Sequence, residues 1–429
     1  MRRVPLLVLA LLPNVWPAAA RAQDWRPLFD GRTFAGWRGQ EHRNPYELAA
    51  MSEAKRDAIR AQDDASMRAH WRIADGELIN DGEGAYLTTV EEFGDAEYEL
   101  EYRTVALADS GIYLRGCPQV QIWDTTEAGG KWKIGADKGS GGLWNNKRHE
   151  RFPPAVADRP FGEWNTLRIR QVGATTWVEL NGVTTVDGVV MDNYWDYDRP
   201  LPRTGPLQLQ THGGEIRFRN LRVRTIGADE ANALLAGQDR GGFEPIFDGE
   251  TFAGWQGATG DYEIVDGALQ CRRGQGGNLF TTAEYGDFVA RIEFRLPPGG
   301  NNGLAIRYPG EGTPAYTGFE LQVLDNTAEK YAELKPWQYH GSVYGVAPAA
   351  RGYLRPVGQW NFQEVTVAGS RVRVVLNGTE ILDADLAGAS SQLEGHVGKD
   401  RALGHFGFCG HDDPVAFRAI AIRRLDRGR

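Results

Sequence analysis

The stretch Phe29-Asp-Gly-Arg-Thr-Phe-Ala-Gly-Trp37 occurs a second time as Phe247-Asp-Gly-Glu-Thr-Phe-Ala-Gly-Trp255. More pairs follow in the same order: Asp75-Gly76 with Asp266-Gly267, Gly162-Glu-Trp164-Asn165 with Gly358-Gln-Trp360-Asn361, and Leu180-Asn-Gly182 with Leu376-Asn-Gly378. A repeat that keeps its order over nearly the whole chain indicates two copies of one structural unit. The repeat therefore sets the domain organisation.

We predict a first domain over 23–227, a linker over 228–242 and a second domain over 243–429. A chain of 429 residues fits roughly two to three domains of about 150 residues each. The linker contains a helix-like Ala-Leu-Leu-Ala run. The first copy carries an insertion whose segment 46–70 is rich in Ala, Glu, Arg and Met, which favour helix. We expect this insertion to be a helical excursion that covers a sheet edge or the other copy.

Outside the insertion the pattern is one of short strands separated by turns. Segments 97–103 and 166–170 alternate between apolar and polar residues, and 371–376 leads into Asn377-Gly378, a hairpin signal. The 54 glycines are spread along the chain, as the turns of a strand-rich fold require. We therefore predict an all-β fold in which each copy packs two antiparallel sheets into a β-sandwich. The repeated tryptophans Trp37, Trp255, Trp164 and Trp360 are expected in the cores.

The N-terminus is typical of a signal peptide over 1–22. Arg2 and Arg3 precede an apolar run, and Ala20-Arg-Ala22 matches a cleavage site. No later run approaches the roughly 20 apolar residues of a membrane-spanning helix. We expect export to the periplasm or the extracellular space, without membrane insertion.

Charge and composition narrow the classes of molecule that this protein is expected to bind. The net charge is −9 and there is no basic cluster, which argues against nucleic acid. His396, His405 and His411 do not match a zinc-ligand spacing, so we expect no metal and no cofactor. The three cysteines do not form a disulfide framework; Cys271 and Cys409 either pair or, like Cys117, remain buried thiols.

Several motifs resemble the 3-keto-disaccharide hydrolase domain family, and they occur in both copies in family order. They are the Phe-Asp-Gly start, Gly111 to Arg115 and Gly303 to Arg307, Gln121 to Asp124 and Gln322 to Asp325, the Trp-Asn and Asn-Gly pairs, and His212 and His411 before Phe-Arg. The resemblance implies tandem jelly-roll sandwiches of the concanavalin A-like type. It also implies hydrolysis of glycosides or disaccharides whose sugar carries a ketone at C3. The family's usual Glu before the strand Gln is kept as Glu320, but the first copy has Gln119.

Strand alternation assigns the polar residues to one face. Leu321 and Val323 are expected in the core, which leaves Glu320 and Gln322 on the opposite face. Likewise Leu304 and Ile306 are expected on one side of their strand and Arg307 on the other. In the first copy the outward residues are expected to be Gln119, Gln121, Trp123, Tyr113 and Arg115, with Val120 and Ile122 inside. Sugars offer hydroxyls to such amides and C–H faces to aromatic rings, for which Trp123, Trp132 and Trp144 are candidates.

A ketone at C3 acidifies the hydrogen at C2, so a base can remove that proton and the glycosidic oxygen then leaves C1. Water adds back and completes the hydrolysis. We expect Glu320 or Asp325 as the base, His411 as acid or proton relay, and Arg307 with Gln322 as donors to the enolate oxygen. The remaining substrate-binding candidates are Asn302, Arg115, Gln121, Asp124, Trp123 and His212.

Other interpretations stay open from the sequence. An ordinary two-carboxylate glycosidase is an alternative mechanism, and a non-catalytic, lectin-like carbohydrate-binding protein is an alternative function. A structural protein would bind no soluble sugar. At the level of residues, Arg115–Asp124 and Arg307–Asp325 could be ion pairs, the two histidines could be structural, and Glu320 could be solvated.

Overall fold

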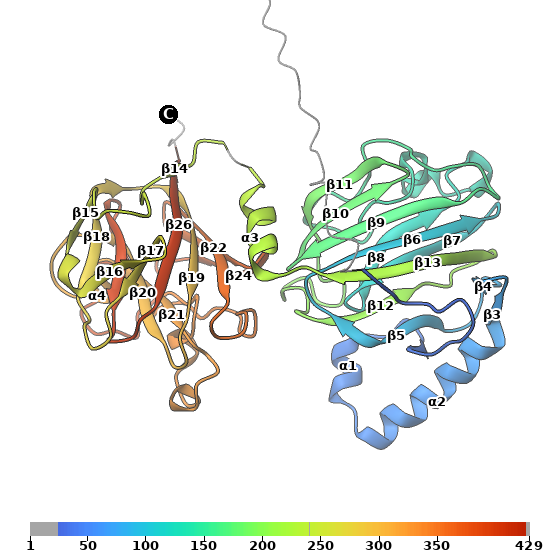
Figure 1. Ribbon diagram of the computed structural model, residues 1–429, viewed down its shortest axis with the longest axis horizontal. Helices are drawn as coiled ribbons and strands as arrows, with labels where there is room; N and C mark the ends of the chain where they lie inside the picture. Colours follow the sequence, from blue (N-terminus) through green and yellow to red (C-terminus); the bar gives the residue numbers. More distant parts are fainter. Residues whose placement is uncertain (1–24, 240, 426–429) are drawn as a thin grey trace, which may run out of the picture.

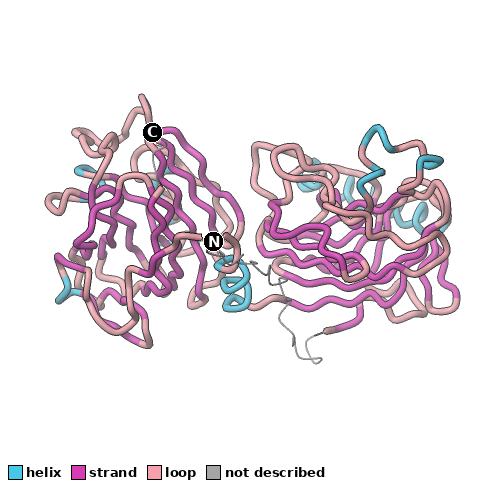
Figure 2. The backbone as a smooth tube through the Cα atoms, turned by 90° about the horizontal axis from the view of Figure 1, so that it is seen from above, coloured by secondary structure: helices cyan, strands magenta, loops and turns pink. Residues whose placement is uncertain are grey.

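The computed structural model describes residues 25–239 and 241–425, and these form two β-sandwich domains that lie next to each other (Figure 1). The predicted signal peptide lies outside the described residues. Each domain pairs one eight-stranded sheet with one five-stranded sheet, and all strand pairs are antiparallel. Figure 2 shows two strand-rich bodies with a helix between them. The prediction of two sandwich domains is confirmed.

The strand order is the same in both domains. The large sheet of the first domain runs β11 (Val183–Val190), β10 (Thr175–Leu180), β9 (Asn165–Val172), β6 (Ala96–Thr104), β13 (Ile216–Thr225), β4 (Glu77–Asn80) and β3 (Trp71–Ala74), with β1 (Arg26–Pro27) beside β13. Its small sheet runs β2 (Trp37–Gln40), β5 (Tyr86–Phe93), β12 (Gly205–Leu209), β7 (Asp109–Leu114) and β8 (Cys117–Trp123).

In the second domain the large sheet runs β24 (Thr379–Asp385), β23 (Arg371–Leu376), β22 (Trp360–Ala368), β19 (Phe288–Arg295), β26 (Ala416–Arg424), β17 (Ala268–Cys271) and β16 (Tyr262–Val265), with β14 (Glu244–Pro245) beside β26. The small sheet runs β15 (Trp255–Gly257), β18 (Asn278–Tyr285), β25 (Gly404–Gly410), β20 (Asn301–Tyr308) and β21 (Phe319–Leu324). Corresponding positions can therefore be read directly from the strand registers.

Alternating apolar side chains fill the space between the sheets, as the period of two requires. Val120 and Ile122 lie in the core of the first domain, and Leu321 and Val323 lie in the core of the second. The predicted faces of these strands are thus confirmed. The hairpin prediction is also confirmed, because β23 and β24 pair across Asn377-Gly378, both of which adopt positive φ.

The framework tryptophans divide into two kinds. Trp37 and Trp255 are buried, as expected. The prediction was wrong for Trp164 and Trp360, which are half-buried beneath arginine side chains. The guanidinium carbon of Arg219 lies 4.0 Å from the Trp164 ring centroid, and that of Arg418 lies 4.1 Å from the ring of Trp360. A cation over an aromatic face is attractive, so these rings are satisfied at the surface.

The insertion folds into α1 (Pro45–Ala50) and α2 (Glu53–His70), and it covers a sheet edge. Helix α2 packs against the edge strand β2, where the Gly39 amide donates to the Asp64 carboxylate at 2.6 Å. Gly39 is required at this contact, since a Cβ there would lie 2.1 Å from the Asp63 carbonyl oxygen. The insertion is thereby fixed beside the small sheet of the first domain.

Helix α3 (Ala228–Ala236) forms in the predicted linker and packs between the domains. Leu235 shares an apolar cluster with Val172 of the first domain and Phe362 of the second. Next to it, the Ala174 amide donates to the Gly378 carbonyl at 3.0 Å. The two domains are therefore in direct contact.

All three cysteines are free and buried. Cys271 and Cys409 thus do not form the disulfide that the sequence left open. No helix among the described residues is long and apolar enough to cross a membrane.

Candidate active sites on the small sheets

The first domain holds a cavity of about 470 Å³ on the outer face of its small sheet. Strands β7 and β8 and the segment directly after β12 line its floor. The loop after β8, the segment between β11 and β12 and the start of the insertion line its sides. Its lining residues are His42, Tyr86, Asp109, Tyr113, Gln119, Gln121, Trp123, Lys131, Ile134, Trp144, Asn145, Tyr194, Gln210 and His212. The outward face predicted for Gln119, Gln121, Trp123 and Tyr113 is confirmed.

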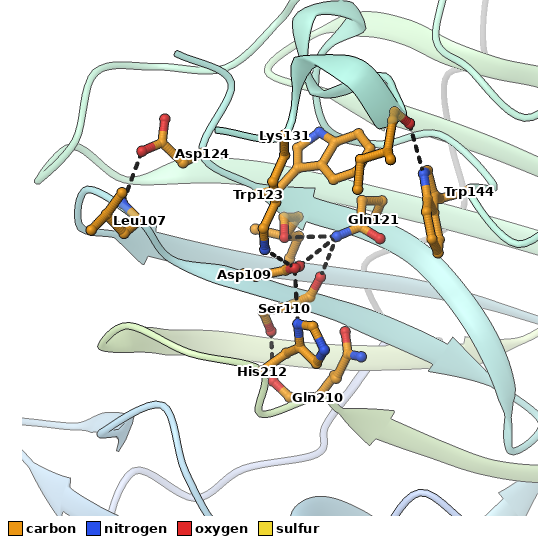
Figure 3. A network of polar contacts seen from close by, with 12 residues as sticks. Leu107, Asp109, Ser110, Gln121, Trp123, Asp124, Lys131, Trp144, Gln210 and His212 are labelled. Carbon is orange, nitrogen blue, oxygen red and sulfur yellow. Dashed lines mark hydrogen bonds and ion pairs between the residues drawn. The ribbon is translucent and has the colours of Figure 1, made fainter. Parts of the chain in front are cut away.

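Asp109 is the centre of a polar network on this floor (Figure 3). His212 Nδ1 lies 2.9 Å from its Oδ2, Gln121 donates to its Oδ1 at 2.7 Å, and the Lys131 ammonium forms an ion pair with it. Asp109 begins β7, and His212 follows the end of β12, its neighbour in the sheet. The sheet thus brings together two residues that are about a hundred positions apart in sequence.

The two partners in this pair shift each other's pKa in opposite directions. Burial alone would raise the pKa of the Asp109 carboxyl, but the bonds from His212 and Lys131 hold it below its usual range. The bond to Asp109 raises the pKa of His212. Asp109 is therefore an anion, and it favours the protonated form of His212. Because Asp109 is bonded to Nδ1, the Nε2 of His212 is the atom that can exchange a proton with a ligand.

Three glutamine amides lie side by side on the cavity floor. Gln119 donates to Gln121, and Gln210 donates to the Tyr113 hydroxyl at 3.4 Å. Within the described chain, the side-chain oxygens of Gln119 and Gln210 have no hydrogen-bond partner. Buried acceptors without donors are costly, so a ligand that supplies hydroxyl groups would improve this site.

Aromatic rings surround the polar floor. Trp123 and Trp144 meet edge to face at 6.1 Å, and Trp144 is held by a hydrogen bond to the Ile134 carbonyl at 3.1 Å. Both rings line the cavity, as predicted for stacking platforms, whereas Trp132 is exposed and does not line it. A cavity with amide donors and acceptors below and aromatic walls around fits a sugar ring.

The second domain presents a different arrangement at the corresponding place. Glu320 on β21 is buried, and burial raises the pKa of its carboxyl to about 7. Its Oε1 lies 4.0 Å from Nε2 of His411, whose own pKa burial lowers. Gln322 donates to the Asn301 side-chain oxygen at 2.6 Å. Two of the predicted catalytic residues, Glu320 and His411, are therefore brought together.

The carboxylate has exchanged position between the domains. The registers place Gly111 opposite Gln121 and Gly303 opposite Gln322, so Asp109 corresponds to Asn301 and Gln119 to Glu320. Each site has one acid and one amide at these two places, but in opposite order. Gln119, which departs from the family pattern, is therefore one of two differences between the sites. The other is Asp109 in place of Asn301.

Asp124 and Asp325 lie away from these acid–histidine pairs. The Asp124 carboxylate accepts the Leu107 amide at 2.8 Å and both the amide and hydroxyl of Thr126, and Figure 3 shows it apart from the Asp109 network. Asp325 accepts the Gly299 amide at 2.8 Å and the corresponding groups of Thr327. Both carboxylates are occupied in holding the turns at the ends of β8 and β21.

The two strand arginines are also directed elsewhere. Arg115 and Arg307 adopt positive φ, which breaks the alternation used to place them on the outer face. Arg115 pairs with Asp95 at 3.2 Å, and Arg307 pairs with Asp287 at 2.9 Å. The ion pairs suggested by the sequence therefore had the wrong partners. Asn302 is fully buried, and its side-chain oxygen accepts the Gly303 amide at 2.9 Å.

The residues of the first cavity that sequence reasoning missed include Asp109, Lys131, His42 and Gln210. Asp109 could have been found, because it stands directly before the repeated Ser110-Gly111 where the other copy has Asn301. Lys131 and His42 lie in a loop and an insertion, where no strand periodicity indicates direction. In the part of the chain described, no three His, Cys, Asp or Glu side chains gather as a metal-binding group.

A family model described as a 3-keto-alpha-glucoside-1,2-lyase-like domain matches residues 24–224 and 242–423. The chain belongs to this family. Its two matched segments coincide with the two β-sandwiches, so both sites lie in domains of the 3-keto-alpha-glucoside-1,2-lyase-like family.

Three individual proteins are similar to parts of this chain. A protein of Bacteroides thetaiotaomicron named 3-keto-disaccharide hydrolase is 27% identical over 247 residues, which cover 47% of this chain and 85% of the relative. A solved structure of a putative glycosyl hydrolase from Parabacteroides distasonis is 23% identical, with a TM-score of 0.39, over 43% of this chain and 99% of that one. The carbohydrate-binding module CBM66 from Bacillus subtilis is 18% identical, with a TM-score of 0.28, over 40% of this chain and 95% of the module.

Proposed function

We propose that this protein cleaves 3-keto-glycosides and 3-keto-disaccharides by removal of the C2 proton, elimination at C1 and addition of water. The observation that supports this most is the Asp109–His212 pair on the floor of an aromatic-walled cavity. Membership of the 3-keto-alpha-glucoside-1,2-lyase-like family supports a glycoside as substrate, and the cavity contains residue types that this reaction could use. The proposal includes export through residues 1–22.

In this mechanism His212 acts as the acid. Asp109 keeps it protonated, and its Nε2 delivers a proton to the glycosidic oxygen as the C1–O bond breaks. The Lys131 ammonium, paired with Asp109, lines the same cavity and supplies positive charge that can stabilise the enolate. The side-chain oxygens of Gln119 and Gln210 accept hydrogen bonds from hydroxyl groups of the sugar, and Trp144 packs on the apolar face of the sugar ring.

The second domain is a second candidate site for the same chemistry. Its Glu320 has a pKa of about 7, which suits a group that must both accept and release a proton near neutral pH. His411, 4.0 Å away, is the natural partner for that proton. In this version Glu320 is the base and His411 the acid or relay, with Gln322 and the neighbouring Asn301 as hydrogen-bond donors.

The test is sugar release by the purified protein from 3-keto-disaccharides, beside the unoxidised parent sugars. We expect cleavage of the keto forms alone. His212→Asn should lower kcat/KM by about 10²- to 10⁴-fold if the first domain catalyses, whereas Glu320→Gln should do so if the second domain does. His149→Asn is the matched control, since His149 forms a similar pair with Asp192 at 2.6 Å outside the cavity.

Binding without cleavage would contradict the proposal and would make the protein a carbohydrate-binding module. Release from unoxidised parents at the same rate would also contradict it, because the C2 hydrogen of such sugars is not acidic. That outcome would favour a two-carboxylate mechanism instead.

A further inference from the structure

The insertion of the first domain contributes a histidine to the cavity, and nothing in the repeat accounts for it. His42 lies two residues after the end of β2 and lines the cavity. The second domain has no counterpart, because the insertion is absent from it. His42 is therefore a titratable group that the insertion adds to the first cavity.

The position of His42 is built by several contacts. The Asp63 carboxylate of α2 accepts the Glu41 amide at 3.2 Å and the Arg43 guanidinium at 2.8 Å, which holds the chain on both sides of His42. The imidazole packs 4.7 Å from the ring of Trp195 and 5.7 Å from that of Tyr194. The ring is thus oriented by its surroundings while remaining accessible from the cavity.

One ring nitrogen is bound and the other is available. His42 Nδ1 lies 3.0 Å from the Tyr113 hydroxyl, which in turn is hydrogen bonded to Tyr86. When Tyr113 donates to Tyr86, its oxygen accepts the Nδ1–H of His42. The lone pair on Nε2 is then available, which is the tautomer required of a base.

We infer that His42 is a catalytic base of the first domain and removes the C2 proton of the 3-keto sugar. This inference rests on the proposed function and names a residue for the step that the Asp109–His212 pair does not perform. The two histidines line the same cavity, so one bound sugar can contact both.

Electrostatics support this division of roles. Burial lowers the pKa of His42, and the nearby charge of His212 lowers it further. The bond to Asp109 raises the pKa of His212. Two groups in one site whose pKa values are driven apart form an acid–base pair, the neutral one as base and the protonated one as acid.

The proton balance closes over one cycle. His42 Nε2 takes the C2 proton, and the C–H electron pair forms the enolate of the C3 ketone. The enolate then forms the C1–C2 double bond and expels the C1 oxygen, which takes the proton of His212. In hydration, neutral His212 accepts a proton from water as its oxygen bonds to C1, and His42 returns its proton to C2. Both histidines regain their starting forms.

The test separates proton removal from bond cleavage. A 1-deoxy-3-keto sugar has no leaving group at C1, so exchange of its C2 hydrogen in D₂O reports the base alone. We expect His42→Asn to slow this exchange, followed by NMR, by about 10²-fold or more. His70→Gln, on the same insertion but outside the cavity, is the control and should exchange at the wild-type rate.

A second variant guards against misfolding. His42→Ala should regain exchange when imidazole is added, which an unfolded protein would not do. Exchange at the wild-type rate in His42→Asn would overturn the role of His42 and leave the proposed function standing. A wild-type protein that neither exchanges the C2 hydrogen nor cleaves 3-keto-disaccharides would instead refute the proposed function itself.

Discussion

Replacing Glu320 by glutamine should stabilise the second domain, and by an amount that depends on pH. In the folded protein burial raises the pKa of this carboxyl from 4.5 to about 7. The folded state therefore holds a proton that the unfolded state has released, and stability falls as pH rises from about 4.5 to 7. Each pKa unit corresponds to about 1.4 kcal/mol, so above pH 7 the ionisable side chain costs about 3 kcal/mol. Glutamine cannot ionise and avoids this cost.

Calorimetric unfolding of wild type and Glu320→Gln at pH 4.5 and pH 8 measures the effect. We expect a small difference at pH 4.5 and a rise of roughly 6–12 °C in the transition of the second domain at pH 8. Gln119→Glu is the matched reverse change and should lower the transition of the first domain at pH 8. If Glu320→Gln changed the transition temperature by the same amount at both pH values, the reasoning would be refuted. The change could not then come from ionisation of Glu320.

Three further changes test other parts of the structure. Asp109→Asn should lower kcat/KM by about 10²-fold or more and move the alkaline limb of the pH–rate profile to lower pH, because His212 loses the partner that raises its pKa; an unmoved limb would contradict this. Gly39→Ala should lower the free energy of unfolding in urea by about 1–3 kcal/mol, since the new Cβ meets the Asp63 carbonyl. An unchanged urea midpoint would contradict this, because it would mean that α2 moves away from β2 at no measurable cost. Trp144→Ala should raise KM about tenfold through lost sugar stacking, and a loss confined to kcat would argue against that role.

Much of the framework could be predicted from the sequence, because it depends on local patterns that the chain shows twice. The period of two placed Val120 and Leu321 in the cores, and Asn377-Gly378 marked a hairpin. The same period failed at Arg115 and Arg307, where a positive φ rotates the side chain away from its expected face. Local irregularity in a strand leaves no mark in the residue pattern.

The sites were less predictable because they are assembled by tertiary contacts. Glu320 and His411 were expected together and are together. Asp325 was expected with them as well, but its carboxylate serves turn amides, a role that an isolated Asp after a strand does not reveal. His42 reaches the first cavity only because α2 is anchored on β2, and nothing in the insertion's composition shows that contact.

The exchanged carboxylates also constrain how the two halves can have diverged. Starting from either pattern, one substitution produces two acids on neighbouring strands or none at all. Two acids so close in a buried site would repel or share a proton, and a site without an acid would have no carboxylate to pair with its histidine. Every single-step path between the Asp109 and Glu320 arrangements therefore crosses an impaired intermediate. A protein with two copies of the domain tolerates such an intermediate in one copy, since the other copy keeps an intact site. Recombination between the two copies would tend to restore identical acid positions in both.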